Sequence, residues 1–390
     1  MFTYGSVCSG IEAVSVAWRG FASPLWFSEI EPFACAVLAH HYPEVPNLGD
    51  ITTLPARILK REVAAPDVLI GGTPCQAFSV AGLRKSLKDE RGNLTLVFVR
   101  IADAIDKVRK DDGKPPLIIL WENVPGVLNT GDNAFGYFLA GLAGEENAAL
   151  QPPGAKWSRA GMVHGRRYIM WRTLDAQYFG VPQRRNRVYL IATARAQCVG
   201  KILFEPESLR GNTTPGKGSE KKTTAYVESG FGAYRRSSVG GTVRANGGTQ
   251  GHGSETIICV HGTQTPVVSH IAHCLGCNSR QENAVIALAS NTINGQVLTG
   301  GNGNGFDMSG KCYTVASSGI HGVCYSSVVR RLTPVECERL QGFPDNWTKV
   351  PYRNQPAEKC PDTPRYKVIG NSMAVPVIQW IGLRLKTYFL

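Results

Sequence analysis

The sequence lacks the features that mark membrane, secreted and disulfide-stabilised proteins. No apolar run approaches the ~18 residues that a membrane-spanning helix needs. The first residues contain neither a basic segment with a long apolar core nor an Arg-rich amphipathic leader. The 11 cysteines, an odd number scattered through both halves, fit a reducing compartment better than a disulfide framework. We therefore expect a soluble intracellular protein with no membrane partner.

Acidic residues are scarce relative to basic ones. The chain has 30 Asp and Glu against 42 Lys and Arg, which gives a formal net charge of +12 and a pI near 9.2. This balance favours a polyanionic partner such as nucleic acid. A chain of 390 residues exceeds one ordinary core, and 43% apolar residues exclude general disorder, so we expect two domains.

The segment around Cys75 is the strongest candidate for chemistry. The apolar run Val68-Leu69-Ile70 ends in Gly71-Gly72-Thr73-Pro74, which predicts a buried strand that delivers Cys75 to a loop. In open α/β sheets, ligands bind at this end of the strands. A free cysteine is also commonly just a small buried apolar residue, so this pattern alone leaves a structural role open.

The N-terminal segment has the order expected of a nucleotide-binding sheet. An extended segment leads into the turn Cys8-Ser9-Gly10 and a helical stretch, and Glu29 follows the apolar run Leu25-Trp26-Phe27. Backbone N–H groups at such a turn can face a ligand, and an acidic residue after the second strand is where ribose hydroxyls are bound. A helix is predicted over residues 32–41.

Later segments bring further polar residues to the same edge of the sheet. The apolar run 117–121 predicts a strand buried on both faces, which delivers Glu122 to the edge where Cys75 lies. Two more strands are predicted over 168–174 and 188–192. Two C-terminal helices are predicted over 334–342 and 377–388, the first with an N-cap at Thr333, a capping box with Glu336 and a stop at Gly342.

The composition changes after about residue 195. Residues 205–325 are dense in Gly, Ser, Thr and Asn and keep short β-branched runs, which predicts short strands joined by long loops. Four residues there have the ligand types of a zinc site: His270, His273, Cys274 and Cys277. Because adjacent His273 and Cys274 suit one tetrahedral site poorly, we favour ordinary loop residues and expect no metal.

Taken in order and spacing, these blocks resemble the DNA cytosine-5 methyltransferase family. The most specific matches are Pro74-Cys75-Gln76, which is similar to the nucleophile loop, and the Gln-x-Arg-x-Arg pattern at 183–187. The chain departs from the family at Ser6, at Cys8 and at Glu12-Ala13, where an acidic residue, an aromatic residue and Gly-Gly are usual. These departures concern the details of the cofactor pocket.

The resemblance implies a fold and a cofactor. We expect an α/β, Rossmann-like sheet that binds S-adenosyl-L-methionine, with a second, smaller, mostly β and loop domain for target recognition. The catalytic domain is predicted to join 1–195 with 366–390, and the recognition domain to span 196–365 with a C-terminal helix at about 333–342. The expected cofactor-binding residues are Cys8, Ser9, Gly10, Ile11, Glu29, Ile30, Asp50, Ile51, Gly72, Pro74, Leu94, Asn371 and Ser372.

The resemblance also implies the chemistry. Cys75 is expected to attack C6 of a flipped-out cytosine and Glu122 to protonate its N3, so that C5 can accept the methyl group. Arg187 is expected near O2 of that base, and Arg185 at a phosphate or at the catalytic loop. The expected DNA contacts are Gln76, Ser79, Arg84, Lys85, Asn123, Gln183, Arg235, Arg236 and Arg244.

Two alternatives differ in substrate or in activity. RNA cytosine-5 methylation is disfavoured because the chain has no Cys-Phe-Thr segment and a long variable region. A catalytically silent DNA-binding protein is disfavoured because Cys75 and Glu122 are both present. We expect a monomer that acts at a short target sequence in double-stranded DNA, in the cytoplasm or nucleoid if the source is prokaryotic or viral. The sequence does not specify a partner endonuclease.

Overall fold

A computed structural model of the chain describes residues 1–73, 94–145, 148–195, 199–204 and 332–388, together with the backbone of six short strands between 226 and 331. The chain divides into two compact units. The larger comprises Met1–Asn212, Thr314–Ser318 and Thr333–Leu390, and the smaller comprises Thr213–Tyr313 and Gly319–Leu332. The stretch 333–365, with the helix that we had placed in the recognition domain, therefore belongs to the larger unit.

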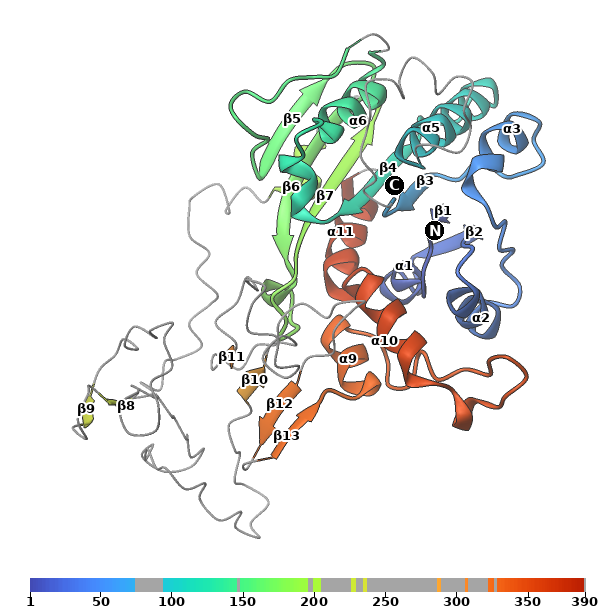
Figure 1. Ribbon diagram of the computed structural model, residues 1–390. Coiled ribbons are helices and arrows are strands. Elements are labelled where there is room, and N and C mark those ends of the chain that lie inside the picture. Colours follow the sequence, from blue (N-terminus) through green and yellow to red (C-terminus); the bar gives the residue numbers. More distant parts are fainter. Residues whose placement is uncertain are drawn as a thin grey trace. The chain divides into compact units, whose positions relative to one another are not determined.

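A seven-stranded mixed sheet organises the larger unit, in the order β2-β1-β3-β4-β7-β6-β5 (Figure 1). The first four of these strands are parallel, whereas β7, β6 and β5 pair antiparallel. This order confirms the predicted Rossmann-like α/β class. The strands are β1 (Phe2–Val7), β2 (Ala22–Ser28), β3 (Val68–Gly71), β4 (Ile118–Asn123), β5 (Ala160–His164), β6 (Tyr168–Asp175) and β7 (Asn186–Thr193).

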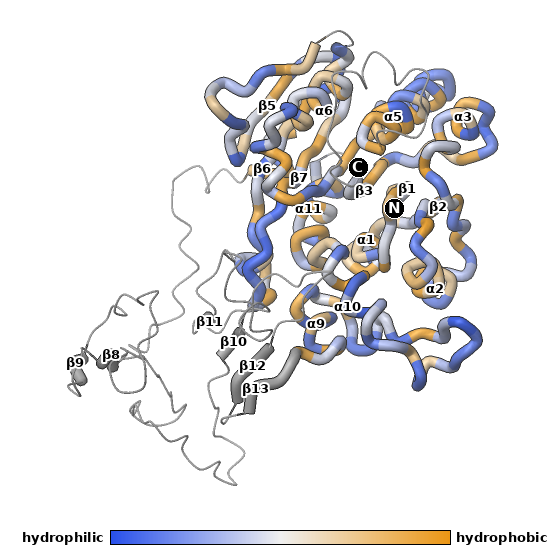
Figure 2. The backbone as a smooth tube through the Cα atoms, viewed as in Figure 1, coloured by the Kyte–Doolittle hydropathy of each residue, from blue (hydrophilic) through white to orange (hydrophobic). Residues whose placement is uncertain are grey.

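Helices cover both faces of this sheet. One face packs on α3, α5 and α6 in a continuous apolar core that contains Leu69, Trp121 and Leu190, while α1 packs against α11 apart from this core. Figure 2 shows hydrophobic and hydrophilic residues alternating along α5, as expected of an amphipathic helix. The helices are α1 (Ala13–Ala17), α2 (Pro32–His41), α3 (Leu54–Leu59), α5 (Leu94–Asp111), α6 (Ala134–Ala143), α7 (Gly200–Leu203), α9 (Pro334–Gln341), α10 (Asp362–Asn371) and α11 (Val375–Tyr388). Short 3₁₀ turns are η1 (Ile51–Thr53), η2 (Pro125–Asn129), η3 (Ala176–Tyr178) and η5 (Ala357–Lys359).

The C-terminal helices are core elements. By length and composition alone, the stretch Asp362–Tyr388 could cross a membrane, but 67% of its most apolar window is buried within the protein. Trp18, the C-cap residue of α1, donates its indole N–H to the Ile378 carbonyl at 2.9 Å, which fixes α11 against α1. The apolar composition of these helices is therefore explained by packing.

The predicted capping of α9 is confirmed. Thr333 accepts the Glu336 N–H at 3.3 Å and Glu336 accepts the Thr333 N–H at 2.7 Å, which is the expected capping box. Pro334 begins the helix, and Gly342 ends it with φ +82°. Each feature follows from the local sequence.

The smaller unit contains two small antiparallel sheets, as the β and loop prediction requires. One has the order β11-β10-β12-β13 and the other pairs β8 with β9. The strands are β8 (Tyr226–Glu228), β9 (Tyr234–Arg236), β10 (Ile286–Leu288), β11 (Phe306–Asp307), β12 (Gly322–Tyr325) and β13 (Val328–Arg331). Arg235 and Arg236 thus lie on β9, whereas Arg244 and the four possible zinc ligands lie outside the described residues.

Candidate active site

The ends of β3 and β4 meet at one rim of the sheet. The two strands pair in parallel with Gly71 opposite Trp121, and Asn123 donates its side-chain amide to the Thr73 carbonyl at 2.9 Å. A Cβ placed on Gly72 would lie 3.1 Å from the Glu122 carbonyl oxygen and 3.3 Å from Glu122 Oε2. A side chain at this position would crowd the Glu122 carboxyl group, so glycine suits this close approach.

The segment that follows holds the predicted nucleophile. Residues 74–93 lie outside the described part of the chain, and with them the predicted site residues Pro74, Cys75, Gln76, Ser79, Arg84 and Lys85. Thr73 is the last described residue before this segment, and it is held by Asn123 next to Glu122. The chain therefore enters the Cys75 loop at the rim where Glu122 lies.

Glu122 is a buried carboxyl group at this rim, with 8% of the residue exposed. Burial raises the pKa of Glu122, although the positive charges of Arg185 and Arg187 act in the opposite direction. Arg187 Nε lies 3.3 Å from Glu122 Oε1. A carboxyl group with a raised pKa keeps its proton to higher pH and can act as a general acid.

Arg185 holds a different part of the site together. Its Nη2 donates to the Ser372 carbonyl at 2.6 Å and to the Gly370 carbonyl at 3.2 Å, and its backbone N–H donates to Asp175 Oδ1 at 2.9 Å. Burial and the nearby charge of Arg187 lower the pKa of Arg185 to about 10, so it remains a cation at neutral pH. Arg185 thus ties the start of β7 to the turn after α10, and acts as a positioning residue.

A small cavity of about 60 Å³ lies between the turn after β1 and the turn after α10. Gly72 and Glu122 also line it, so the cavity and the rim are parts of one site. Five of its residues were not predicted, although each either departs from the family pattern or adjoins a predicted or departing residue. The lining residues are Ser6, Val7, Cys8, Ser9, Gly10, Ala13, Val14, Gly72, Glu122, Asn371, Ser372 and Met373.

Glu29 lies beside this cavity, and its carboxylate accepts hydrogen bonds from backbone N–H groups. Glu29 Oε2 accepts the Gly10 N–H at 2.8 Å, and Oε1 accepts the N–H groups of Ile30 at 2.9 Å and Glu31 at 2.8 Å. The carboxylate therefore has a fixed position at the end of β2. The pKa of the neighbouring Cys8 thiol is raised to about 12 by burial and by the charge of Glu29, so this thiol stays neutral.

The remaining predicted cofactor residues separate into exposed and buried groups. Ile30 is 71% exposed, which is unusual for a large apolar side chain, and Asp50 is exposed at the start of η1. Ile11 is fully buried, Ile51 belongs to the core and Leu94 packs against it. These three side chains lie in the protein interior and do not line the cavity.

Two residues expected at the DNA interface have other partners. Gln183 is fully buried and donates its side-chain amide to the Leu340 carbonyl at 2.8 Å. Asn123 is buried and bonded to Thr73. Both side chains therefore bond to protein backbone, and their contacts with DNA stay a prediction.

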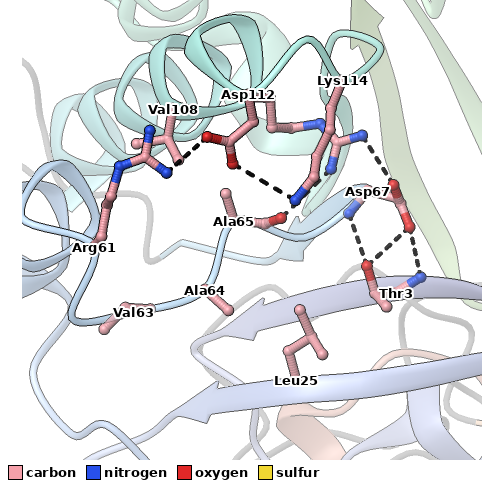
Figure 3. A pocket seen from close by; sticks show the side chains of 11 residues that line it. Thr3, Leu25, Arg61, Val63, Ala64, Ala65, Asp67, Val108, Asp112 and Lys114 are labelled. Atoms are coloured by element: carbon pink, nitrogen blue, oxygen red, sulfur yellow. Dashed lines mark hydrogen bonds and ion pairs between the residues drawn. The ribbon is translucent and has the colours of Figure 1, made fainter.

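A larger cavity of about 470 Å³ lies at the opposite end of the strands (Figure 3). Its charged residues pair with one another: Arg109 with Asp67 at 2.8 Å, and Arg61 with Asp112 at 2.7 Å. Thr3 donates its N–H and its hydroxyl to the same Asp67 carboxylate. These ion pairs connect the segments that precede β3 and β4, so we interpret this cavity as structural.

Comparison with known proteins identifies relatives over the whole length of the chain. The family described as "C-5 cytosine-specific DNA methylase" matches residues 2–387. An Escherichia phage P1 protein named "DNA N-6-adenine-methyltransferase" is 38% identical over 477 residues, which cover 98% of this chain and 61% of the phage protein. The type II methyltransferase M.HpaII of Haemophilus parainfluenzae is 26% identical, and the match covers 98% of this chain and 89% of that enzyme.

Solved structures agree on the fold. The S. pombe Dnmt2 methyltransferase superposes with a TM-score of 0.55 at 16% identity over 99% of both chains. The chain spans less than two thirds of two phage relatives, 61% of the P1 protein and 32% of M.Rho11sI from Bacillus phage rho11s. Because the family match extends over residues 2–387, the chain belongs to the C-5 cytosine-specific DNA methylase family.

Proposed function

We propose that the protein transfers a methyl group from S-adenosyl-L-methionine to C5 of a flipped-out cytosine within a short target sequence of double-stranded DNA. One observation carries the proposal. Glu122, a buried carboxyl group with a raised pKa, borders the cavity formed by the glycine turn after β1 and lies beside the entry to the Cys75 loop. These observations support a proton donor and a site for the methyl donor at the rim from which the chain continues into the predicted nucleophile loop.

The residues at the cavity fit the cofactor. The Cys8-Ser9-Gly10 turn and the Asn371-Ser372 turn form its opposite walls and suit the amino-acid end of the molecule. Glu29, fixed at the end of β2, is placed to accept ribose hydroxyls. The exposed Ile30 and Asp50 offer an apolar surface and an acceptor for adenine. When bound, S-adenosyl-L-methionine supplies an electrophilic methyl group on a sulfonium.

Cytosine C5 needs activation before it can accept this methyl group. The Cys75 thiolate forms a bond to C6, and the displaced electron pair moves toward N3, which takes the proton of Glu122. C5, now enamine-like, takes the methyl group. Loss of the C5 proton to a base then re-forms the C5–C6 double bond, the bond from C6 to sulfur breaks with release of the Cys75 thiolate, and N3 returns its proton to Glu122. Arg187, next to Glu122, is placed to bind O2 of the same base.

The target base must leave the duplex for these groups to reach it. We assign target recognition to the smaller unit, with Arg235 and Arg236 of β9 and Arg244 as candidates for contacts with DNA. The excess of basic residues favours binding to the phosphates of the duplex. We propose a monomeric enzyme acting in the cytoplasm or nucleoid, as its phage and bacterial relatives suggest.

Methylation of adenine N6 is the second candidate, because the phage P1 relative carries that name. The match covers 61% of that protein, so its name need not describe the matched part. An adenine amino group needs no covalent activation of the ring, whereas the retained Cys75 and Glu122, whose pKa is raised by burial, serve such activation. The site therefore favours cytosine.

The test uses tritiated S-adenosyl-L-methionine with duplex DNA or transfer RNA. Label in the DNA, recovered after hydrolysis as 5-methylcytosine, is the expected result. Label recovered as N6-methyladenine supports the second candidate, and label in RNA alone contradicts the assignment of DNA as substrate. Cys75→Ala should abolish transfer and covalent trapping on 5-fluorocytosine DNA while cofactor binding persists, and continued turnover by this variant refutes the proposed nucleophile.

A further inference from the structure

The turn that follows β1 has a strained backbone. Cys8, Gly10 and Glu12 have φ values of 48°, 56° and 58°, in the left-handed region that residues other than glycine rarely adopt. Cys8 and Gly10 line the candidate donor cavity, so the conformation of this turn shapes one of its walls. A strained conformation persists only where the surrounding contacts hold it. The contacts of the turn therefore bear directly on the cavity.

Two hydrogen bonds hold this turn from different parts of the chain. Gly10 donates its N–H to Glu29 Oε2 at 2.8 Å, at the end of β2. Trp347 donates its indole N–H to the Ile11 carbonyl at 2.9 Å, across 336 residues of sequence. Because Ile11 directly follows Gly10, the bond from Trp347 fixes the turn next to the cavity wall.

Trp347 is itself fixed in place. The residue is buried, and its ring stacks on the His41 ring with 3.6 Å between the centroids and 0° between the planes. The Trp347 carbonyl accepts the Nε2–H of His41 at 2.8 Å. His41 is the last residue of α2, so the position of the indole N–H is set by α2 as well as by its own segment.

The segment that carries Trp347 contacts other parts of the candidate site as well. It begins with α9, where the Leu340 carbonyl accepts the side-chain amide of Gln183 at 2.8 Å. Gln341 donates its side-chain amide to the Ile369 carbonyl at 3.0 Å, close to the turn after α10. A change at the Trp347 side chain would therefore act on the turn after β1 and leave these two connections in place.

We infer that Trp347 is a positioning residue for the methyl donor, whose indole N–H holds the strained turn after β1 in the conformation that forms the cavity wall. This inference rests on the proposed function. Trp347 does not line the cavity, so it acts through the Ile11 carbonyl and the backbone of Gly10. Its effect is on the shape of the site and not on its charge. S-adenosyl-L-methionine and its product S-adenosyl-L-homocysteine should therefore respond alike.

Trp347→Phe removes the indole N–H and keeps an aromatic ring for stacking on His41. The loss of a donor to a buried carbonyl is equivalent to about five- to 150-fold in an equilibrium constant. We expect the Kd of each ligand to rise at least about fivefold in calorimetry on the full chain. At saturating donor, kcat should change less than about twofold, because the contacts of Glu122 and Arg187 are retained.

Trp26→Phe is the matched control. Trp26 is also buried and donates its indole N–H to the Ala64 carbonyl at 2.9 Å, at the cavity on the opposite end of the strands. Both variants lose one indole bond of the same length, so thermal melting should show a similar loss of stability. Only Trp347→Phe should weaken ligand binding. An unchanged Kd in Trp347→Phe, or an equal rise in Trp26→Phe, overturns the inference.

Amide hydrogen exchange gives a readout that needs no ligand. Exchange in residues 9–13 should be faster in Trp347→Phe than in the unmodified protein and should be unchanged in Trp26→Phe. Equal exchange in all three proteins contradicts the role of Trp347. If the unmodified protein binds neither ligand, the proposed function fails, and exchange still reports whether Trp347 holds the turn.

His41→Phe decides if Trp347→Phe does not fold. This variant keeps a ring against Trp347 and loses the bond to the Trp347 carbonyl. It should raise both Kd values at least about twofold, because the indole N–H is then less well fixed. Kd values equal to those of the unmodified protein contradict the inference.

Discussion

Replacing Glu122 by glutamine tests the general acid directly. The change retains the size of the side chain and an oxygen for Arg187, which lies 3.3 Å from Oε1, but removes the proton that N3 of cytosine would receive. Because burial raises the pKa of Glu122, the native protein keeps this group protonated to higher pH than an exposed glutamate. The amide therefore resembles the native protonated form in shape and charge, and differs from it in acidity.

The expected loss of rate follows from the role of Glu122 as a general acid. A positioned general acid contributes about 10²- to 10⁴-fold to a rate, which corresponds to ~2.7–5.4 kcal/mol of transition-state stabilisation at 1.36 kcal/mol per factor of ten. We expect Glu122→Gln to lower kcat by about this factor. Stability should not fall, because the folded-state pKa of Glu122 lies above its unfolded value. The native protein therefore loses stability as pH rises between the two values, and glutamine removes that loss.

The assay is single-turnover methyl transfer to duplex DNA across pH 5–9, with thermal melting of each variant. The native rate should fall as pH rises through the raised pKa of Glu122, whereas the variant should be slow and lack this limb. Glu44→Gln, at an exposed position, provides the control and should match the native enzyme. A Glu122→Gln rate within about threefold of native, with the alkaline limb retained, refutes the acid assignment.

Three further predictions concern residues that hold the site or its supporting helices. Arg185→Met loses the bonds to the Gly370 and Ser372 carbonyls and should raise the Kd for S-adenosyl-L-methionine in calorimetry at least about tenfold. Arg184→Met, at an exposed position, should leave this Kd unchanged, and equal affinity in both variants contradicts a positioning role for Arg185. Gly342→Ala should cost ~1–3 kcal/mol in urea unfolding, because φ is +82° and the new Cβ would lie 2.6 Å from Pro376 Cδ, whereas Gly126→Ala has open space and should be nearly neutral. Thr333→Ala should cost about 1 kcal/mol by removing the capping box of α9, and an unchanged unfolding midpoint counts against that estimate.

The sequence correctly predicted those helices whose ends are set by side chains a few residues away. The bounds of α2 and the caps of α9 agree with the sequence, because side chains within a few residues set them. The helix α6 was not predicted, since its two glycines suggest a loop, yet a Cβ on Gly136 would collide with the Leu150 carbonyl, and this contact exists only in the folded chain. The edge strand β5 and the helix α10 were missed for similar reasons, because a short segment and an internal proline weaken their patterns.

The candidate site shows the same difference between features set by nearby residues and contacts made across the fold. Spacing within the first strands and their turns indicated Cys8, Gly10, Glu29 and Glu122. The side chains of Gln183 and Arg185 donate to backbone carbonyls more than 150 residues away in sequence, as with the 157 residues between Gln183 and Leu340. Every residue has a backbone carbonyl, so a sequence motif cannot indicate which carbonyl accepts a given hydrogen bond. The bonds of Gln183 and Arg185 to these carbonyls therefore could not be predicted from the sequence.

The packing of α11 on α1 has a consequence for synthesis. The bond from Trp18 to the Ile378 carbonyl spans 360 residues, and the cavity takes its walls from residues 6–14 and 371–373. A ribosome makes residues 6–14 long before residues 371–373, so a growing chain has one part of the cavity lining and an uncovered α1 until α10 and α11 emerge. The cavity is therefore complete only after α10 and α11 have been made, and we expect a chain that stalls before them to lack the lining that Asn371, Ser372 and Met373 provide.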